Sequence, residues 1–139
     1  MKATARTLQI DAADLMTLRE IGPWLDVALP QLFDGEGITG AKPKIELAVH
    51  EICMNIVQHA YHDKPGSITL DIASSGDSIT ITITDGGTGF DPVEISEPDP
   101  AKPTIRGYGL MITRQLTSSL RYYQTSSGNH WDLSFPVSE

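Results

Sequence analysis

The stretch from Ile45 to Tyr61 constrains the fold most, because it combines an apolar helical face with polar residues on the other side. Its apolar residues recur at intervals of three and four, the spacing that lines one face of an α-helix. They are Ile45, Ala48, Ile52, Ile56 and Ala60. Glu51, Asn55 and His59 are spaced four apart on the opposite side, so a helix places them on one face. Such a polar face is either solvated or the wall of a buried site, and the helix alone does not decide between the two.

Two pairs of segments have the pattern of β-hairpins. Residues 78–85, SITITITD, alternate strictly, with isoleucines on one side, and they follow a strand pattern over 67–73. The connection, SSGD, contains Gly76, and glycine is common in hairpin turns. Residues 120–125 and 130–136 form a second pair around SSGN. The sequence therefore predicts a largely antiparallel sheet.

The N-terminal part predicts a short edge strand over 4–10 and a helix over 13–33. Asp11 or Asp14 would cap that helix, and the Gly-Pro pair at 22–23 would kink or break it. The core face expected for this helix is Leu15, Leu18, Ile21, Leu25 and Leu29.

The remaining connections complete the order of elements. Residues 34–40 are expected to form a loop, with Pro43 in the first turn of the next helix. Residues 93–106 are rich in proline and acid and fit no regular element, and long loops of this kind are often functional lids. Residues 107–117 predict a helix entered through Gly-Tyr-Gly. The order β-α-α-β-β-loop-α-β-β predicts an α+β two-layer sandwich, with helices on one face of a mostly antiparallel sheet, as one domain over 1–139.

Length, composition and charge narrow the classes of function. A chain of 139 residues suits one domain, and 40% hydrophobic with 20% charged residues excludes wholesale disorder. The net charge of −8 argues against a nucleic-acid binder, which needs Lys and Arg, and favours partners with basic patches. The lone Cys53 permits no internal disulfide and fits a reducing cytoplasm. With no signal-peptide core and no apolar run of membrane-spanning length, we expect a cytoplasmic protein.

Two glycine-rich segments are candidate ligand loops. DGGTGF, residues 85–90, starts at a strand end, where glycines let a loop pass close to a ligand. Asp85 can accept hydrogen bonds there from an amine. Gly107-Tyr108-Gly109 opens a helix, whose free N–H groups and dipole favour an anion such as phosphate. Either segment alone is equally compatible with an ordinary turn.

Several competing motifs are incomplete. There is no G-x-x-x-x-G-K-[ST], and Pro92 and Ile112 replace the third glycine of G-x-G-x-x-G in the two glycine segments. Met54 stands where the zinc-protease motif H-E-x-x-H needs its second histidine. Cys53 and His59 do not share a helical face, which argues against a zinc site on this helix. A serine hydrolase would need a G-x-S-x-G elbow, which is absent.

The combination of motifs is more specific than its parts. E-x-x-x-N on a helix, D-x-G-x-G-F after a strand and G-x-G-L opening a helix occur here in that order. In this they resemble the Bergerat-fold ATPases, which include gyrases, heat-shock chaperones, histidine kinases and mismatch-repair proteins. Within that group, the short length and the strings HEICMNIVQHAY and TDGGTGFDP are most similar to the anti-sigma-factor serine kinases. The resemblance covers about Ile45 to Leu133.

The resemblance implies a role for each motif residue. Glu51 would be the general base for the attacking hydroxyl, and Asn55 would hold the Mg²⁺ that bridges the phosphates of ATP. Asp85 would receive the adenine amino group. The residues implied to line the nucleotide with Asn55 and Asp85 are Gly87, Gly89, Phe90, Arg106, Gly107, Tyr108, Gly109 and Leu110.

Some of these roles are less closely defined, and parts of the chain depart from the family pattern. Arg106 would reach the γ-phosphate or the incoming serine, whereas Tyr108 and Leu110 either cover the nucleotide or fill the core. The family often has Gly-Thr in its terminal strand, where the hydroxyl helps to bind adenine. This chain has Gly128-Asn129-His130, so that contact is expected to be altered or mediated by water.

By resemblance, the protein is an ATP- and Mg²⁺-dependent serine-protein kinase and anti-sigma factor that works by partner switching. It would phosphorylate a serine on an anti-anti-sigma antagonist and sequester a sigma factor or a similar target. The alternative is an ATP-binding interaction module with little or no kinase activity. A histidine-kinase domain is disfavoured, because no upstream dimerisation helix with a phospho-acceptor histidine is visible. A homodimer is expected from the family likeness alone.

Overall fold

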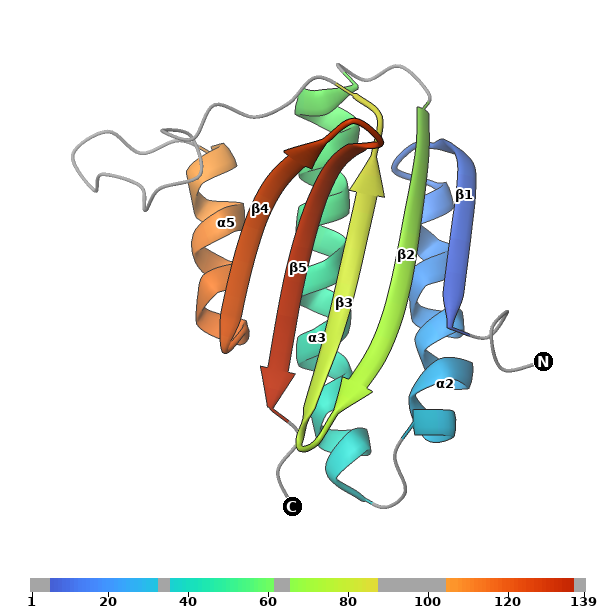
Figure 1. Ribbon diagram of the computed structural model, residues 1–139, viewed down its shortest axis with the longest axis vertical. Coiled ribbons are helices and arrows are strands. Elements are labelled where there is room, and N and C mark those ends of the chain that lie inside the picture. Colours follow the sequence, from blue (N-terminus) through green and yellow to red (C-terminus); the bar gives the residue numbers. More distant parts are fainter. Residues whose placement is uncertain (1–5, 33–35, 62–65, 88–104, 137–139) are drawn as a thin grey trace.

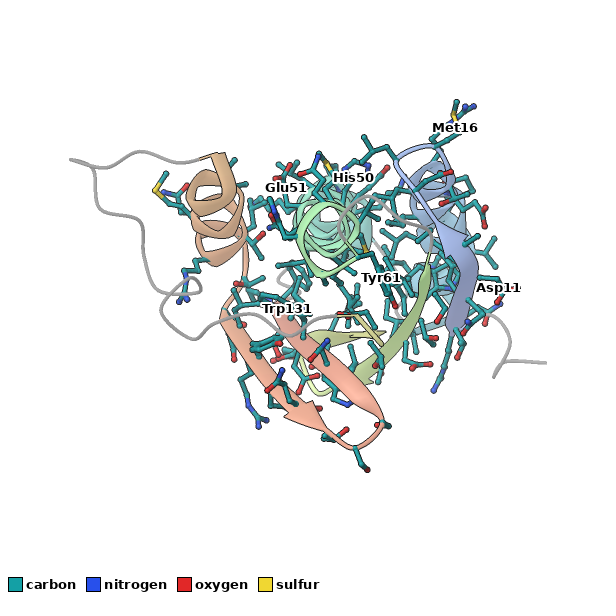
Figure 2. All side chains as sticks on the ribbon, turned by 90° about the horizontal axis from the view of Figure 1, so that it is seen from above. Asp11, Met16, His50, Glu51, Tyr61 and Trp131 are labelled. Atoms are coloured by element: carbon teal, nitrogen blue, oxygen red, sulfur yellow. The ribbon has the colours of Figure 1, made fainter. Side chains whose placement is uncertain are left out.

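The computed structural model describes residues 6–32, 36–61, 66–87 and 105–136, with backbone alone at 36–39, 75 and 105–110. Five strands form one antiparallel sheet in the order β1-β2-β3-β5-β4. They are β1 (Thr7–Ala13), β2 (Gly66–Ser75), β3 (Ser78–Asp85), β4 (Ser119–Thr125) and β5 (Gly128–Pro136). The helices α2 (Ile21–Leu32), α3 (Glu36–Asn55) and α5 (Ile105–Leu116) lie on one face of this sheet (Figure 1, Figure 2). This arrangement confirms the predicted two-layer α+β fold.

The strands β3 and β5 show how strict alternation produces a sheet with one buried face. The isoleucines of β3 are fully buried, and each is paired across the sheet with a large apolar residue of β5. These pairs are Ile79–Phe135, Ile81–Leu133 and Ile83–Trp131. On the opposite face, the threonines of β3 form hydrogen bonds with polar residues of β5. These bonds join Thr80 to Ser134 (3.2 Å), Thr82 to Asp132 (2.9 Å) and Thr84 to His130 (3.1 Å).

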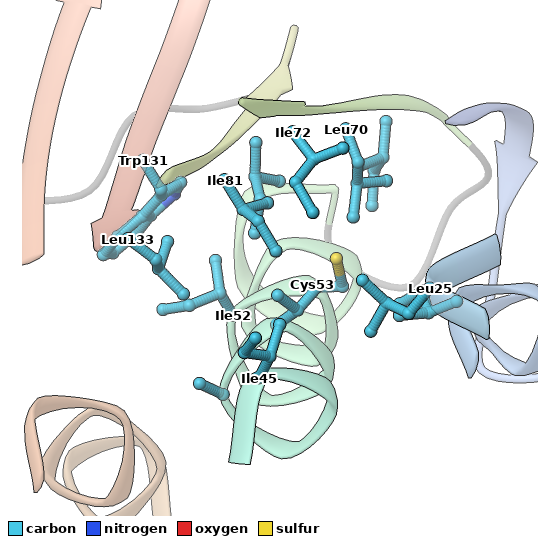
Figure 3. Close-up of a cluster of buried hydrophobic side chains, with 14 of the residues drawn as sticks. Leu25, Ile45, Ile52, Cys53, Leu70, Ile72, Ile81, Trp131 and Leu133 are labelled. Atoms are coloured by element: carbon cyan, nitrogen blue, oxygen red, sulfur yellow. The ribbon is translucent and has the colours of Figure 1, made fainter. Parts of the chain in front are cut away.

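The central helix α3 packs its apolar face on the buried face of the sheet (Figure 3). Every apolar position predicted for this face, from Ile45 to Ala60, is buried, which confirms the helical pattern. The final turn differs from the prediction, because Ile56–Ala60 forms a π-helix, η2, closed by a hydrogen bond from the N–H of Tyr61 to the carbonyl of Ile56 (2.9 Å). A π-helical turn frequently marks a functional site. Here it directly follows Asn55.

The entry into the helical layer differs from the expected single helix over 13–33. The predicted edge strand exists as β1 but extends to Ala13, and a 3₁₀-helix, η1 (Thr17–Glu20), precedes α2. The Asp14 carboxylate accepts from the N–H of Thr17 (2.8 Å), and the Thr17 hydroxyl accepts from the N–H of Asp14 (2.8 Å). This reciprocal pair fixes the start of η1. Pro23 lies in the first turn of α2, where its missing N–H removes no helical bond, so no break occurs at 22–23.

The core face predicted for this region is nearly right. Leu18, Ile21, Leu25 and Leu29 are buried. Leu15 is 52% exposed, contrary to the prediction, because it precedes η1 and does not lie on the helical face.

The loop predicted over 34–40 is wrong from residue 36 onward, because α3 already starts there and contains Pro43 in its interior. An ion-pair cluster stabilises this early part of the helix. The ammonium of Lys42 lies 2.9 Å from the carboxylate of Asp26 on α2 and 3.1 Å from that of Glu46 one turn further along α3. These contacts raise the pKa of Lys42, the bond to Asp26 contributing most.

The C-terminal half follows the prediction closely. Both hairpins form, and Gly76 in the first has the positive φ of +59° that favours glycine. Helix α5 starts at Ile105, two residues before the predicted start. Of the irregular lid expected over 93–106, residues 93–104 lie outside the described residues, and residues 105–106 belong to α5 instead. Among the described helices, none is both long enough and apolar enough to cross a membrane.

Candidate functional site

Four predicted site residues lie on or just after two elements that meet where β3 ends beside the last turn of the central helix: Glu51, Asn55, Asp85 and Gly87. A Cβ on Gly87 would lie 2.7 Å from the carbonyl oxygen of Ala60 in η2. Glycine is therefore required for the chain after β3 to pass over the helix end. This close approach brings Asp85 and Gly87 next to the helix that carries Glu51 and Asn55.

Tyr61 holds this junction together, although no motif in the sequence singles it out. Its hydroxyl donates to the carbonyl oxygen of Ser67 (2.6 Å) and accepts from the N–H of Gly86 (2.8 Å). A Cβ on Gly66 would overlap its ring, at 2.3 Å. The tyrosine thus ties the end of the helix to the start of β2 and the end of β3. The sequence signal that could have identified this role was an aromatic residue at a helix end, Tyr61, with a glycine, Gly66, at the start of the next strand.

The carboxylate of Asp85 is buried, with 2% of the residue exposed. Its Oδ1 accepts from the N–H of Gly87 (2.8 Å) and from the amide of Asn129 (3.0 Å). Its Oδ2 is also buried and has no hydrogen-bond partner among the described residues. Burial raises the pKa of Asp85, while the bonds from Asn129 and Gly87 and the nearby His130 partly oppose that rise. An acceptor left open at a buried position suits a donor supplied by a ligand.

Asn129 is a part of the site whose role the sequence did not reveal. The residue is buried and lies directly opposite Asp85 in the β3–β5 ladder. Its Nδ2 donates to Asp85 and to the carbonyl oxygen of Gly87 (2.9 Å). Its Oδ1 accepts from the hydroxyl of Tyr122 (3.2 Å) and the amide of Gln124 (3.1 Å) on β4. The family often has threonine at this position. This chain has Asn129 there, and its amide is hydrogen-bonded to Asp85, the residue predicted to receive the adenine amino group.

The residue before it, Gly128, is fixed by the same close packing. Its φ is +134°, and a Cβ there would lie 2.3 Å from the carbonyl oxygen of Asp85. Both the backbone conformation and the available space therefore require glycine. The turn between β4 and β5 can then bring Asn129 against the end of β3.

The polar face of α3 lies on the other side of the site. Asn55 is buried, and its Nδ2 has no hydrogen-bond partner in the part of the chain that the structure describes. Glu51, one turn earlier, is half-buried, on the side of α3 that faces α5 in Figure 2. His59 is also half-buried, but it lies in the π-helical turn and so departs from the predicted four-residue stacking with Asn55.

These groups fit ATP and a divalent cation. Asp85 Oδ2 is an acceptor that an exocyclic amine can satisfy. The atom of Asn55 that lacks a partner among the described residues is Nδ2, a donor, so the amide of Asn55 offers its oxygen at this point when it is turned over. Its carbonyl oxygen is a hard ligand of the type that Mg²⁺ accepts. The carboxylate of Glu51 lies one helical turn before Asn55. This position suits a general base that takes a proton from a hydroxyl near the cation.

The other predicted site residues lie in the segment after β3 and at the start of α5. Gly89 and Phe90 lie outside the described residues. Arg106, Gly107, Tyr108, Gly109 and Leu110 fall within the first two turns of α5. Because α5 begins at Ile105, its free N–H groups belong to residues 105–108, and Gly109 lies just beyond them. Helix α5 packs beside α3, so its first turns are on the helical side of the site.

Cys53 has no role in this chemistry. It is fully buried in the core, and burial, followed by the charge of Asp85, raises the pKa of its thiol well above the usual range. A thiol of this kind is unreactive. No group of three or more metal-ligating side chains occurs among the described residues.

The fold and these residues define a class of ATP-binding domain. Residues 12–135 match the family model of the histidine kinase-like ATPase domain. The chain belongs to this family, which confirms the resemblance to the Bergerat-fold ATPases.

Some individual proteins are similar to this chain in sequence. The serine-protein kinase RsbW of Bacillus cereus is 31% identical to this chain, over 55% of the chain and 53% of the relative. The serine-protein kinase RsbW of Bacillus mycoides is 30% identical over the same shares. The chain thus spans about half the length of the curated relatives it matches. The chain is therefore similar to serine-protein kinases over about half of its own length.

Solved structures agree on the architecture. The histidine kinase domain of a blue-light activated histidine kinase from Erythrobacter litoralis superposes with a TM-score of 0.52 at 21% identity. The match covers 84% of this chain and 61% of that chain. A longer structure of the same kinase gives a TM-score of 0.53 at 24% identity, over 70% of this chain and 31% of that chain. At this level of identity the likeness shows the fold.

Proposed function

We propose that this chain is an ATP- and Mg²⁺-dependent serine-protein kinase that also acts as an anti-sigma factor by partner switching. The observation that carries the proposal is the buried carboxylate of Asp85, one oxygen of which has no hydrogen-bond partner among the described residues. Membership of the histidine kinase-like ATPase family supports ATP as the nucleotide. The similarity to serine-protein kinases supports a protein serine as the acceptor.

Each residue has a separate task in this proposal. Asp85 accepts a hydrogen bond from the adenine amino group through Oδ2. Asn55 holds Mg²⁺, which when bound neutralises charge on the phosphates. Glu51 orients the serine hydroxyl and accepts its proton as the hydroxyl oxygen bonds to the γ-phosphorus and the bond to the β-phosphate oxygen breaks. Arg106 stabilises the γ-phosphate.

The residues that line the nucleotide complete the site. Gly87 and Gly89 let their loop approach the base, with Phe90 beside it. The first turns of α5 approach the phosphates with backbone N–H groups, since helix N-termini favour anions. These turns carry Gly107, Tyr108, Gly109 and Leu110.

The partners follow from the same similarity. The substrate is a serine on an anti-anti-sigma antagonist, and the sequestered target is a sigma factor or another regulator. The net charge of −8 supports partners with basic patches. A homodimer and a cytoplasmic location belong to the same proposal.

The test is transfer of the γ-phosphate to a protein captured with ATP present, followed by mapping of the phosphorylated residue. Wild type should phosphorylate a serine, and Glu51→Gln should lower the transfer rate by roughly 10²- to 10⁴-fold while ATP binding persists. His50→Gln changes the neighbouring half-buried residue and serves as the control. If wild type binds ATP and its partner but transfers nothing, the chain is a nucleotide-dependent interaction module. If ATP does not bind, the proposed function is wrong.

A further inference from the structure

The amide of Asn129 uses its whole hydrogen-bonding capacity. Its two N–H groups reach Asp85 Oδ1 and the Gly87 carbonyl, and its oxygen accepts from Tyr122 and Gln124. An amide has two donors and two acceptor lone pairs, so all four are used. Turning the amide over would place its oxygen against two acceptors, the Asp85 carboxylate and the Gly87 carbonyl. The orientation of Asn129 is therefore fixed by its four neighbours.

This arrangement determines what Asp85 can offer a ligand. Two donors, from Gly87 and Asn129, meet at Oδ1 and fix the rotation of the carboxylate. The carbonyl of Gly87 is occupied by the same amide. Of the acceptors in this cluster, Asp85 Oδ2 is the one that stays buried without a partner among the described residues.

Pairing of the strands does not require this side chain. Strands β3 and β5 already form a continuous antiparallel ladder from Ser78–Pro136 to Asp85–Asn129, held by backbone bonds. The edge strand β4 supplies two donors, from Tyr122 and Gln124, to the amide oxygen. The side-chain network therefore connects an edge strand to the carboxylate of the site.

We infer that Asn129 is a positioning residue for the nucleotide base. Held by Tyr122 and Gln124, it fixes Asp85 so that Oδ2 alone faces the amino group of adenine. The inference rests on the proposed function, because it assumes that Asp85 binds the adenine amine. It adds Asn129, Tyr122 and Gln124 of the terminal hairpin to the determinants of base recognition.

The inference also predicts a change in pH dependence. The bond from Asn129 lowers the pKa of Asp85 against the larger effect of burial. Without that bond the carboxyl would stay protonated to higher pH, and a protonated Oδ2 is no longer a pure acceptor. Two other titratable groups are coupled to Asp85: His130 of β5 lowers the pKa of Asp85, and Asp85 raises the pKa of Cys53 on α3. Both are retained in the variants chosen below.

The experiment compares the affinity of Mg·ATP with that of Mg·purine-riboside triphosphate, which lacks the amino group. Isothermal titration calorimetry on the full chain gives the ratio of the two dissociation constants between pH 5 and 9. Wild type should prefer ATP by about 10- to 100-fold, the range expected for a hydrogen bond to a charged acceptor. Asp85→Asn and Asn129→Leu should both bring the ratio close to one at neutral pH. In Asn129→Leu the pH below which the preference for ATP is lost should also be higher than in wild type, because the bond that lowers the pKa of Asp85 is gone.

A second variant tests the same network in case Asn129→Leu does not fold. The double substitution Tyr122→Phe, Gln124→Leu removes the donors that orient Asn129 and should give an intermediate ratio. Tyr123→Phe is the matched control: it removes a neighbouring tyrosine hydroxyl, keeps the ring that stacks on His130, and should behave as wild type. If wild type and Asp85→Asn behave as expected, but Asn129→Leu and the double variant retain the preference and its pH profile, the inference is overturned and the proposed function stands. If wild type shows no binding of Mg·ATP, the proposed function itself fails.

Discussion

Asn129 and Asn55 are both buried asparagines of one site, yet only Asn129 has its amide fully hydrogen-bonded. Asn129, at the strand ends, makes four hydrogen bonds and lies between Asp85 and strand β4. Asn55, on the helix, has a buried Nδ2 without a partner among the described residues. A buried amide atom without a partner costs about 1–3 kcal/mol unless something bound satisfies it. Among the described residues, the fold therefore satisfies the amide on the strand side and leaves one oxygen of Asp85 open, whereas on the helix side it leaves the amide itself unsatisfied.

This difference gives substitutions on the two sides different expected consequences. Changes at the strand ends should affect the stability of the free protein and the recognition of the base together. Changes on α3 should leave the free protein nearly unaffected and appear when ligand, cation or acceptor is added. The predictions below test this division, beginning with the largest effect.

Gly128→Ala should have the largest effect on the free protein. The added Cβ would lie 2.3 Å from the carbonyl oxygen of Asp85, a backbone atom, at a φ of +134° that favours glycine. We expect the free energy of unfolding to fall by about 3 kcal/mol, through strain and overpacking. Urea unfolding followed by circular dichroism measures this loss.

The matched control is Gly76→Ala in the other hairpin. Gly76 also has a positive φ, of +59°, but nothing lies within 4 Å of its added Cβ. Gly76→Ala should lower the free energy of unfolding by only about 1–2 kcal/mol, the cost of the left-handed backbone conformation alone. Equal losses in the two variants would show that the strand ends are not packed as closely as the structure places them.

Asp85→Asn should separate ligand recognition from stability within the strand side. The substituted amide can keep an oxygen for the donors of Gly87 and Asn129 but loses the charged acceptor, so Mg·ATP should bind roughly 10- to 100-fold more weakly. Isothermal titration calorimetry gives this ratio. An unchanged affinity would remove Asp85 from the contact with the base.

The same variant makes a prediction for the free protein as a function of pH. Burial raises the folded-state pKa of Asp85 above the ordinary value of 3.8, so the folded state binds the proton more tightly than the unfolded state. The stability contributed by Asp85 is then fully present below pH 3.8 and is lost as the pH rises through the raised pKa. Asp85→Asn lacks this loss, so its stability relative to wild type should increase from acid to neutral pH. A difference that does not vary with pH would contradict the burial of this carboxylate.

The sequence predicted local patterns well and long-range contacts poorly. The alternation in 78–85 and the helical spacing from Ile45 to Ala60 predict buried faces because each depends on the periodicity of one element. The position of Asp85 at a strand end was also predicted, and β3 ends at this residue. The roles of Tyr61 and Asn129 depend instead on the helix end meeting β3 and on the register that pairs Asp85 with Asn129. No spacing within a single segment contains that information.

The errors have the same physical origin. A helix over 13–33 satisfies the apolar spacing, but the reciprocal bonds of Asp14 and Thr17 select a 3₁₀ entry after a longer strand. A loop over 34–40 fits its glycines, but α3 continues there beside the ion pairs of Lys42 with Asp26 and Glu46. In both cases side-chain contacts outweigh the intrinsic preference of the segment.

Asn55→Leu should have the smallest effect on the free protein and tests the helix side of the comparison. Leucine has a similar size and removes a buried amide that is not fully bonded, so the free energy of unfolding should stay within about 1 kcal/mol of wild type or increase. Asn129→Leu, which removes four hydrogen bonds, should instead lower it by about 2 kcal/mol or more. In Mg²⁺, Asn55→Leu should weaken ATP binding by about 10-fold, whereas in EDTA the two proteins should bind ATP alike, since the amide oxygen acts through the cation. Equal destabilisation by the two leucines, or a loss of affinity independent of Mg²⁺, would mean that the fold completes both sides of the site in the same way.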